Sequence, residues 1–113
     1  MLNHVVLMGN LTADPEIRYT KTNVPYVRYT LAVNRCGGEG TDFIYIRAWD
    51  KRAEFARDWL KKGMRVVVTG QLRQRLWEDR QGIAHSLIEI HAAEQFFAER
   101  KQETAADSSG YPR

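Results

Sequence analysis

The chain has 113 residues, of which 43% are hydrophobic and 27% are charged, a length and composition typical of one globular domain. It has no apolar run near the roughly 18 residues of a membrane span and no basic flank at its N-terminus. These features exclude a transmembrane helix and a secretory signal, and they predict a cytoplasmic protein. The single cysteine, Cys36, excludes an internal disulfide and a cysteine-rich zinc site.

The net charge of +3 favours a polyanionic partner only weakly, because ordinary solvated surface explains it equally well. The distribution of charge is more informative. Residues 61–80 carry six basic and two acidic side chains, whereas residues 81–113 carry three basic and five acidic side chains. Twelve of the 17 basic residues are arginine, which pairs well with phosphate and also stacks on flat rings.

Three strands are predicted in the first half of the chain, with a short extended piece between the first two. Residues 2–11 are rich in β-branched and aliphatic side chains, and residues 16–20 form the short piece. In residues 25–35 and again in residues 41–49, the side chains alternate with a period of two, which predicts half-buried strands. The glycine-rich stretch 37–40 predicts a flexible loop between them.

One helix is predicted after the third strand. We expect Asp50 to cap its N-terminus and Gly63 to follow its C-terminus. The stripe that can face a core consists of Ala53, Ala56 and Leu60, at spacings i, i+3 and i+7. Phe55 and Trp59 are spaced i, i+4, so we expect them to pack together in the core rather than to serve a functional site.

A long hairpin is predicted for the second half of the chain. Residues 64–77 form a strand in which Gly70 indicates a bulge or bend. Residues 78–82 form a turn, and residues 83–97 form the last strand.

This order of elements is the arrangement of the OB-fold, a mainly β, five-stranded Greek-key barrel with one helix between the third and fourth strands. An α+β sandwich shares the order, so the pattern alone leaves both open. We take residues 1–98 as the domain and residues 99–113 as a short flexible polar tail.

Two predicted strands carry aromatic side chains that alternate with arginine on one face. In the third strand, the face opposite the aliphatic side chains holds Phe43, Tyr45, Arg47 and Trp49. In the fourth strand, one face holds Arg73, Arg75 and Trp77. Such a pattern is typical of single-stranded nucleic acid binding, because unpaired bases stack on rings and phosphates require cations.

The alternative is that some of these rings cap the barrel or lie in a subunit interface. We favour this alternative for Tyr45. For Trp77, which is flanked by arginines beside a polar turn, we favour base stacking. The strand pattern alone does not decide between the two roles for Phe43 and Trp49.

The sequence gives no sign of catalysis, of a metal or of another cofactor. The histidines His4, His85 and His91 lack metal-ligand spacing. The glycine-rich loop 37–40 lacks the Lys-Ser/Thr ending of a phosphate-binding loop. Cys36 has no identifiable activating group beside it. We therefore expect a binding protein and not an enzyme.

Two stretches resemble bacterial single-stranded DNA-binding proteins (SSBs). One is the opening NHVVLMGNLTADPEIRY at residues 3–19, and the other pairs TLAVNR at residues 30–35 with GQLRQRLW at residues 70–77. The likeness runs through most of residues 1–98 in order and spacing. It implies an OB-fold protein that coats and protects single-stranded DNA, with little sequence preference, in replication, recombination or repair. It also implies a homo-oligomer, with a tetramer expected before a dimer, in which residues 3–7 pair between subunits.

The resemblance carries the family's stacking rings and basic partners onto this chain. The DNA-binding residues that it implies are Phe43, Trp49, Trp77, Arg73, Arg75, Arg35, Lys51, Lys62 and Arg18. Among the cations, Arg73 and Arg75 come first. The assignment of Arg35 and Arg18 depends mainly on their proximity to strand ends.

Three departures from the family pattern limit the resemblance. A stacking ring that often follows the second strand is replaced by Cys36-Gly37-Gly38, and the loop there is short, so we expect a smaller footprint or weaker binding. The family's acidic tip, closing in Ile-Pro-Phe, recruits repair and replication proteins, whereas residues 107–113 have no such tip. Two alternatives therefore stay open: a primosomal-type adaptor that acts mainly through protein contacts, and an RNA-binding OB module.

Overall fold

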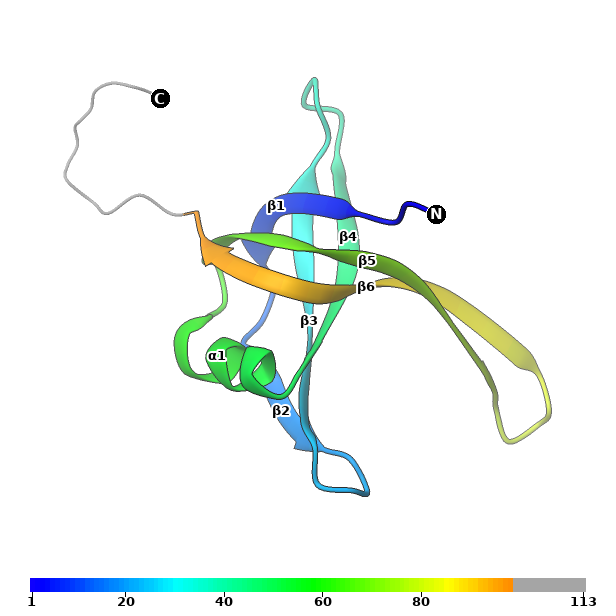
Figure 1. Cartoon of the computed structure of the whole chain (residues 1–113). Coiled ribbons are helices and arrows are strands. Elements are labelled where there is room, and N and C mark those ends of the chain that lie inside the picture. The colour runs from blue at the N-terminus through cyan, green and yellow to red at the C-terminus, as the bar shows by residue number, and fades with distance from the viewer. Residues whose placement is uncertain (99–113) are drawn as a thin grey trace, which may run out of the picture.

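The computed structural model describes residues 1–98 and contains six strands and one helix (Figure 1). The elements are β1 (Val5–Leu11), β2 (Glu16–Tyr19), β3 (Pro25–Asn34), β4 (Thr41–Trp49), α1 (Lys51–Trp59), β5 (Arg65–Glu78) and β6 (Ala84–Phe97). The tail predicted at residues 99–113 lies outside the described residues. Within residues 1–98, no helix is long and apolar enough to cross a membrane.

Five of the strands close into a barrel. The sheet order is β1-β5-β6-β4-β3-β2, and β1 also pairs with β3, which completes a ring from which β2 projects as an extra strand. The β4–β6 pairing is parallel and the other pairings are antiparallel. The predicted OB-fold is confirmed, and the closed ring excludes the α+β sandwich. The short extended piece forms β2, a sixth strand outside the five of the barrel.

The core lies inside this ring, where the predicted period-two alternation places the apolar faces of the strands. Its fully buried strand residues include Val27, Leu31, Ile46, Ala48, Val66 and Val68. The predicted stripe of α1 is buried against them and consists of Ala53, Ala56 and Leu60. Tyr29 is also buried, and burial raises the pKa of its phenol. Its hydroxyl donates to Gln95 Oε1 at 2.6 Å.

The predicted N-cap of the helix is confirmed, whereas its predicted C-terminus is wrong. Asp50 occupies the N-cap position, and its carbonyl accepts the first helical N–H groups, but within the described chain its side chain makes no capping hydrogen bond. The helix ends at Trp59, and Leu60 is already extended. Gly63 lies further on, in the turn to β5, where its φ of 85° uses the conformational freedom of glycine. It is therefore not the residue that terminates the helix.

The predicted packing of Phe55 against Trp59 is also wrong. Phe55 instead contacts Phe97 of β6, with ring centroids 5.7 Å apart, whereas Trp59 is 59% exposed. Ala53, Ala56 and Leu60 supply the buried stripe, so Trp59 falls on its flank at the last helical position, where the chain turns away.

The long hairpin predicted for the second half is confirmed. The pairing of β5 with β6 shifts register between Thr69 and Gly70, which is the irregularity that Gly70 predicted. A Cβ atom at Gly70 would lie 2.1 Å from the His91 carbonyl oxygen, so only glycine allows this close approach. Beyond the bulge, the two strands stay paired out to Glu78 and Ala84 and project away from the barrel (Figure 1).

Candidate nucleic-acid interface

The outer faces of β3, β4 and β6 form one continuous surface, because directly paired residues point to the same side of a sheet. The strand registers align three rows across it, namely Arg18–Tyr26–Trp49, Glu16–Arg28–Arg47–His91 and Thr30–Tyr45–Glu89–Arg73. The hairpin continues this surface with Arg75 and Trp77. We call the side chains Phe43, Tyr45, Arg47, Trp49, Arg73, Arg75 and Trp77 the aromatic face.

The two rings nearest the start of β4 are open to solvent. Phe43 is 63% exposed and Tyr45 is 46% exposed. The period-two prediction for this strand is thereby confirmed, because the intervening Ile46 and Ala48 are fully buried. For Tyr45 we favoured a covered position, but in the single chain the ring is exposed. A recess of about 390 Å³ beside it is lined by Arg28, Tyr29, Thr30, Tyr45, Arg75, Leu87 and Glu89.

Trp49, at the other end of β4, is half-buried among polar and aromatic neighbours. Its ring meets His91 edge-on, with centroids 4.6 Å apart and planes at 65°. The Arg47 guanidinium lies 5.3 Å from the Trp49 ring and 5.1 Å from the Tyr26 ring. One cation thus contacts two rings, those of the cross-strand neighbours Tyr26 and Trp49.

Trp77 lies near the end of the hairpin and is 39% exposed. It stacks on His85, its partner across the hairpin, at 5.2 Å and 19°, and the Arg75 guanidinium lies 4.8 Å from its centre. His85 Nε2 contacts Asp79 Oδ2 at 2.8 Å, and Asp79 Oδ1 accepts the backbone N–H groups of Gln81 and Ile83. The His85 contact and these N–H groups lower the pKa of the Asp79 carboxyl.

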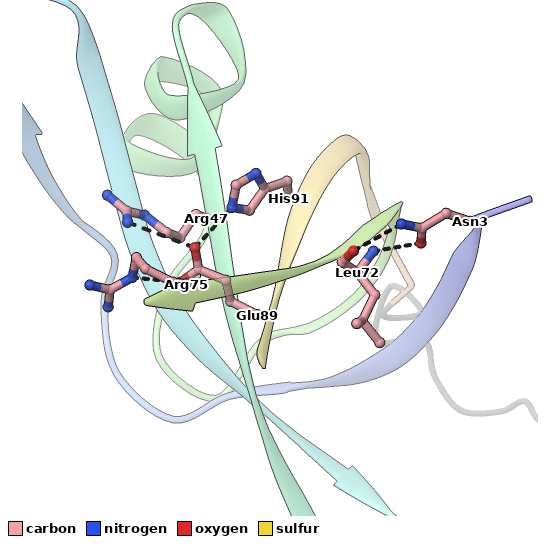
Figure 2. A network of polar contacts seen from close by, with 6 residues as sticks. All are labelled: Asn3, Arg47, Leu72, Arg75, Glu89 and His91. Atoms are coloured by element: carbon pink, nitrogen blue, oxygen red, sulfur yellow. Dashed lines mark hydrogen bonds and ion pairs between the residues drawn. The ribbon is translucent and has the colours of Figure 1, made fainter. Parts of the chain in front are cut away.

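One buried acid connects the two ends of the aromatic face. Glu89 is 1% exposed, and Figure 2 shows its carboxylate at the centre of a polar network. Its oxygens contact His91 Nε2 at 2.8 Å, Arg75 Nε at 3.4 Å and Arg47 Nη1 at 3.8 Å. Sequence reasoning missed this network, because Arg47 joins it only through the parallel β4–β6 pairing and the contact of Arg75 depends on the exact register of the β5–β6 hairpin.

Several of the predicted cations are already paired. Arg75 contacts Glu89, and Arg18 forms an exposed ion pair with Glu16 at 3.1 Å. Arg35, at the end of β3, contacts Asp42 at 2.8 Å, and its hydrogen bonds lower the pKa of that carboxyl. Arg73 is exposed on the aromatic face.

The two predicted lysines lie in different places. Lys51 is exposed at the first position of α1, two residues after Trp49, the last residue of β4. Lys62 lies in the turn between α1 and β5, at the opposite end of β5 from the hairpin (Figure 1). The structure therefore does not gather Lys62 with Trp77. Arg28, which the sequence did not single out, is exposed in the row of Arg47.

An OB-fold barrel that presents open rings alternating with arginine defines a class: a binding module whose outer sheet face suits single-stranded nucleic acid. Comparison with known proteins agrees with this class. The single-strand binding protein family matches residues 2–97, and the chain belongs to that family.

Two relatives and one solved structure show the extent of the likeness. The single-stranded DNA-binding protein of Caldanaerobacter subterraneus subsp. tengcongensis is 46% identical over 106 residues, which cover 89% of this chain and 71% of the relative. Single-stranded DNA-binding protein 1 of Streptococcus pyogenes serotype M18 is 40% identical over 114 residues, which cover 96% of this chain and 88% of the relative. A deletion mutant of the Thermus aquaticus single-stranded DNA binding protein has a TM-score of 0.73 at 37% identity. That match covers 89% of this chain but only 43% of the Thermus chain.

Proposed function

We propose that the protein binds single-stranded DNA with little sequence preference and protects it during replication, recombination or repair. The observation that carries this proposal is the continuous aromatic face, on which Phe43, Trp49 and Trp77 alternate with arginines. Unpaired bases of any sequence offer a π-face to such rings, whereas the bases of a duplex are already stacked on one another. The names of the relatives support the same ligand.

The mechanism has two steps. Exposed cations, Arg73, Lys51 and Arg28 among them, first attract the phosphate backbone and release its counterions. Bases then stack on Phe43, Trp49 and Trp77. Arg18, Arg35 and Arg75 are already paired with carboxylates. They contribute to phosphate binding only as those pairs rearrange, and Lys62 contributes least because of its distance from the hairpin. No catalytic step is part of this function. We propose that the protein acts in the bacterial cytoplasm, at the nucleoid.

The proposed active state is a homo-oligomer, a tetramer in preference to a dimer. Within the described residues, β1 pairs with β5 along its length but meets β3 only at Asn10 and Leu11, so one edge of Val5–Gly9 is open. On its outer face, Val6 and Met8 are 59% and 55% exposed. An open edge beside exposed apolar side chains suits pairing with a second copy. Light scattering tests this, and a monomer at working concentration would contradict it.

The test of the function is a titration of three labelled oligomers of equal length: oligo(dT), its RNA counterpart and a DNA duplex. Fluorescence anisotropy at two salt concentrations gives each affinity. We expect oligo(dT) to bind far more tightly than the duplex, and its affinity to fall as salt rises. Tighter binding of the RNA would favour the RNA-binding alternative. Absence of binding would refute the proposal and favour the protein-contact adaptor.

A further inference from the structure

Glu89 is an acid at the centre of a surface that is proposed to bind a polyanion. Considered by charge alone, it opposes that function. A buried carboxylate is tolerated only where charged or hydrogen-bonding partners compensate it, and Glu89, which is 1% exposed, contacts two guanidinium groups and one imidazole. The partners come from three different strands: Arg47 from β4, Arg75 from β5 and His91 from β6 (Figure 2).

Each partner of Glu89 also touches a tryptophan of the aromatic face. The contacts are Arg75 with Trp77 at 4.8 Å, Arg47 with Trp49 at 5.3 Å, and His91 with Trp49 at 4.6 Å. A single side chain therefore links the carboxylate to each tryptophan, although the two tryptophans lie on different strands and at different ends of the aromatic face.

Arg47 shows what the contact with the Glu89 carboxylate contributes. Its side chain is 17% exposed, and its guanidinium lies 5.1 Å from the centre of the Tyr26 ring and 5.3 Å from that of Trp49. Within residues 1–98, its buried Nε has no hydrogen-bond partner. Since an unsatisfied buried donor is costly, the contact with Glu89 and the two rings must hold the guanidinium in place. Loss of the carboxylate would release Arg47 and, with it, one wall of the Trp49 site.

We propose that Glu89 is a positioning residue of the DNA-binding face. Through Arg47 and His91 it fixes Trp49, and through Arg75 it fixes Trp77, so that both rings are oriented before bases arrive. Such preorganisation strengthens binding because less side-chain freedom is lost on association. This inference rests on the proposed function for its consequence in binding, but the positioning itself exists in the free protein.

The test compares Glu89→Gln with a matched control, Glu16→Gln. Both substitutions remove one negative charge from the same sheet face. Glu16 forms an exposed pair with Arg18 and, within residues 1–98, none of its hydrogen bonds or ion pairs reaches a residue of the aromatic face. If charge alone matters, both variants bind oligo(dT) as tightly as the wild type or more tightly.

If Glu89 positions the two rings, Glu89→Gln should instead weaken oligo(dT) binding. We expect its affinity for oligo(dT) to fall about 5- to 50-fold, the range for weakening one stacked base, with no decrease in the salt slope. Glu16→Gln should bind at least as well as the wild type. Wild-type or tighter binding by a folded Glu89→Gln protein would overturn the proposal.

A second readout does not depend on DNA. In proteins that retain only Trp49 or only Trp77, with the other tryptophans replaced by phenylalanine, Glu89→Gln should shift the emission maximum and lower the fluorescence anisotropy. This outcome separates the two proposals: failure of the wild type to bind DNA refutes the function, whereas unchanged fluorescence refutes the positioning.

Arg47→Lys covers the case in which Glu89→Gln does not fold, as judged by circular dichroism. Lysine keeps a cation facing Glu89 but lacks the flat guanidinium that contacts both the Tyr26 and the Trp49 ring. It should weaken oligo(dT) binding and change Trp49 fluorescence. Wild-type values for both would overturn the proposal.

Discussion

Trp77 is held more firmly than an exposed ring on a hairpin usually is. His85 stacks on it, Arg75 contacts its ring, and Asp79 fixes His85 from the turn. At the same time 39% of the residue stays open to solvent. A ring that is restrained and still accessible is suited to stack on a base.

Replacing Trp77 with alanine should therefore weaken oligo(dT) binding by about 1–3 kcal/mol, the usual contribution of one base–aromatic stack. The salt slope should not change, because no cation is removed. Anisotropy titrations at several salt concentrations measure both quantities. Trp59→Ala is the control, since Trp59 lies exposed on α1 outside the aromatic face. Equal affinities for both variants would remove Trp77 from the site.

The Asp79 carboxylate gives the hairpin turn a defined pH dependence. Its pKa in the folded protein is lowered by His85 and by the backbone N–H groups of Ile83 and Gln81. Its stabilisation is therefore fully present above the ordinary aspartate pKa of about 3.9 and is lost as the pH falls through the lower folded value. In NMR titrations, the Gln81 and Ile83 amide signals should shift with a midpoint below the ordinary value. A midpoint at or above it would contradict this account.

At the scale of elements, the β5–β6 hairpin depends on a single irregularity. The register shift at Gly70 lets the strands pair inside the barrel and again beyond it. Beyond the shift, the hairpin that carries Arg73, Arg75 and Trp77 projects from the barrel (Figure 1).

Gly70→Ala should consequently disturb both stability and binding. The new methyl group would collide with the backbone of His91, a neighbour that cannot move without shifting β6. Overpacking of this kind typically costs about 1–3 kcal/mol of unfolding free energy. Urea denaturation measures the loss, with Gln71→Ala, an exposed neighbour, as the control. A Gly70→Ala protein as stable as the control would show that the bulge tolerates a side chain.

The elements differ in how far the sequence predicts them, and the differences have physical causes. The faces of β3 and β4 were predicted correctly, because alternation along a strand is local and one side must be buried. The N-cap at Asp50 was also predicted correctly, but the C-terminal end was not, because the chain is already extended at Leu60, before Gly63. Trp59 was misplaced because the spacing of two rings does not show which flank of a helix meets the barrel.

At the scale of the whole molecule, ring closure creates the candidate site. The parallel pairing of Tyr45–Arg47 with Glu89–His91 joins residues more than 40 positions apart, and no local pattern reports it. Phe43, Trp49 and Trp77 could be nominated from strand faces and family resemblance. The roles of Glu89 and His91 could not, because each looks like an ordinary polar side chain until the register places it.

The central claim is that bases stack on this barrel face. The most direct measurement is tryptophan fluorescence during titration with oligo(dT), in a Trp59→Phe background so that only Trp49 and Trp77 report, with duplex DNA of equal length in parallel. The account predicts strong quenching by oligo(dT), little by the duplex, and a weaker apparent affinity at higher salt. Binding of oligo(dT) without quenching, or equal quenching by the duplex, would contradict it.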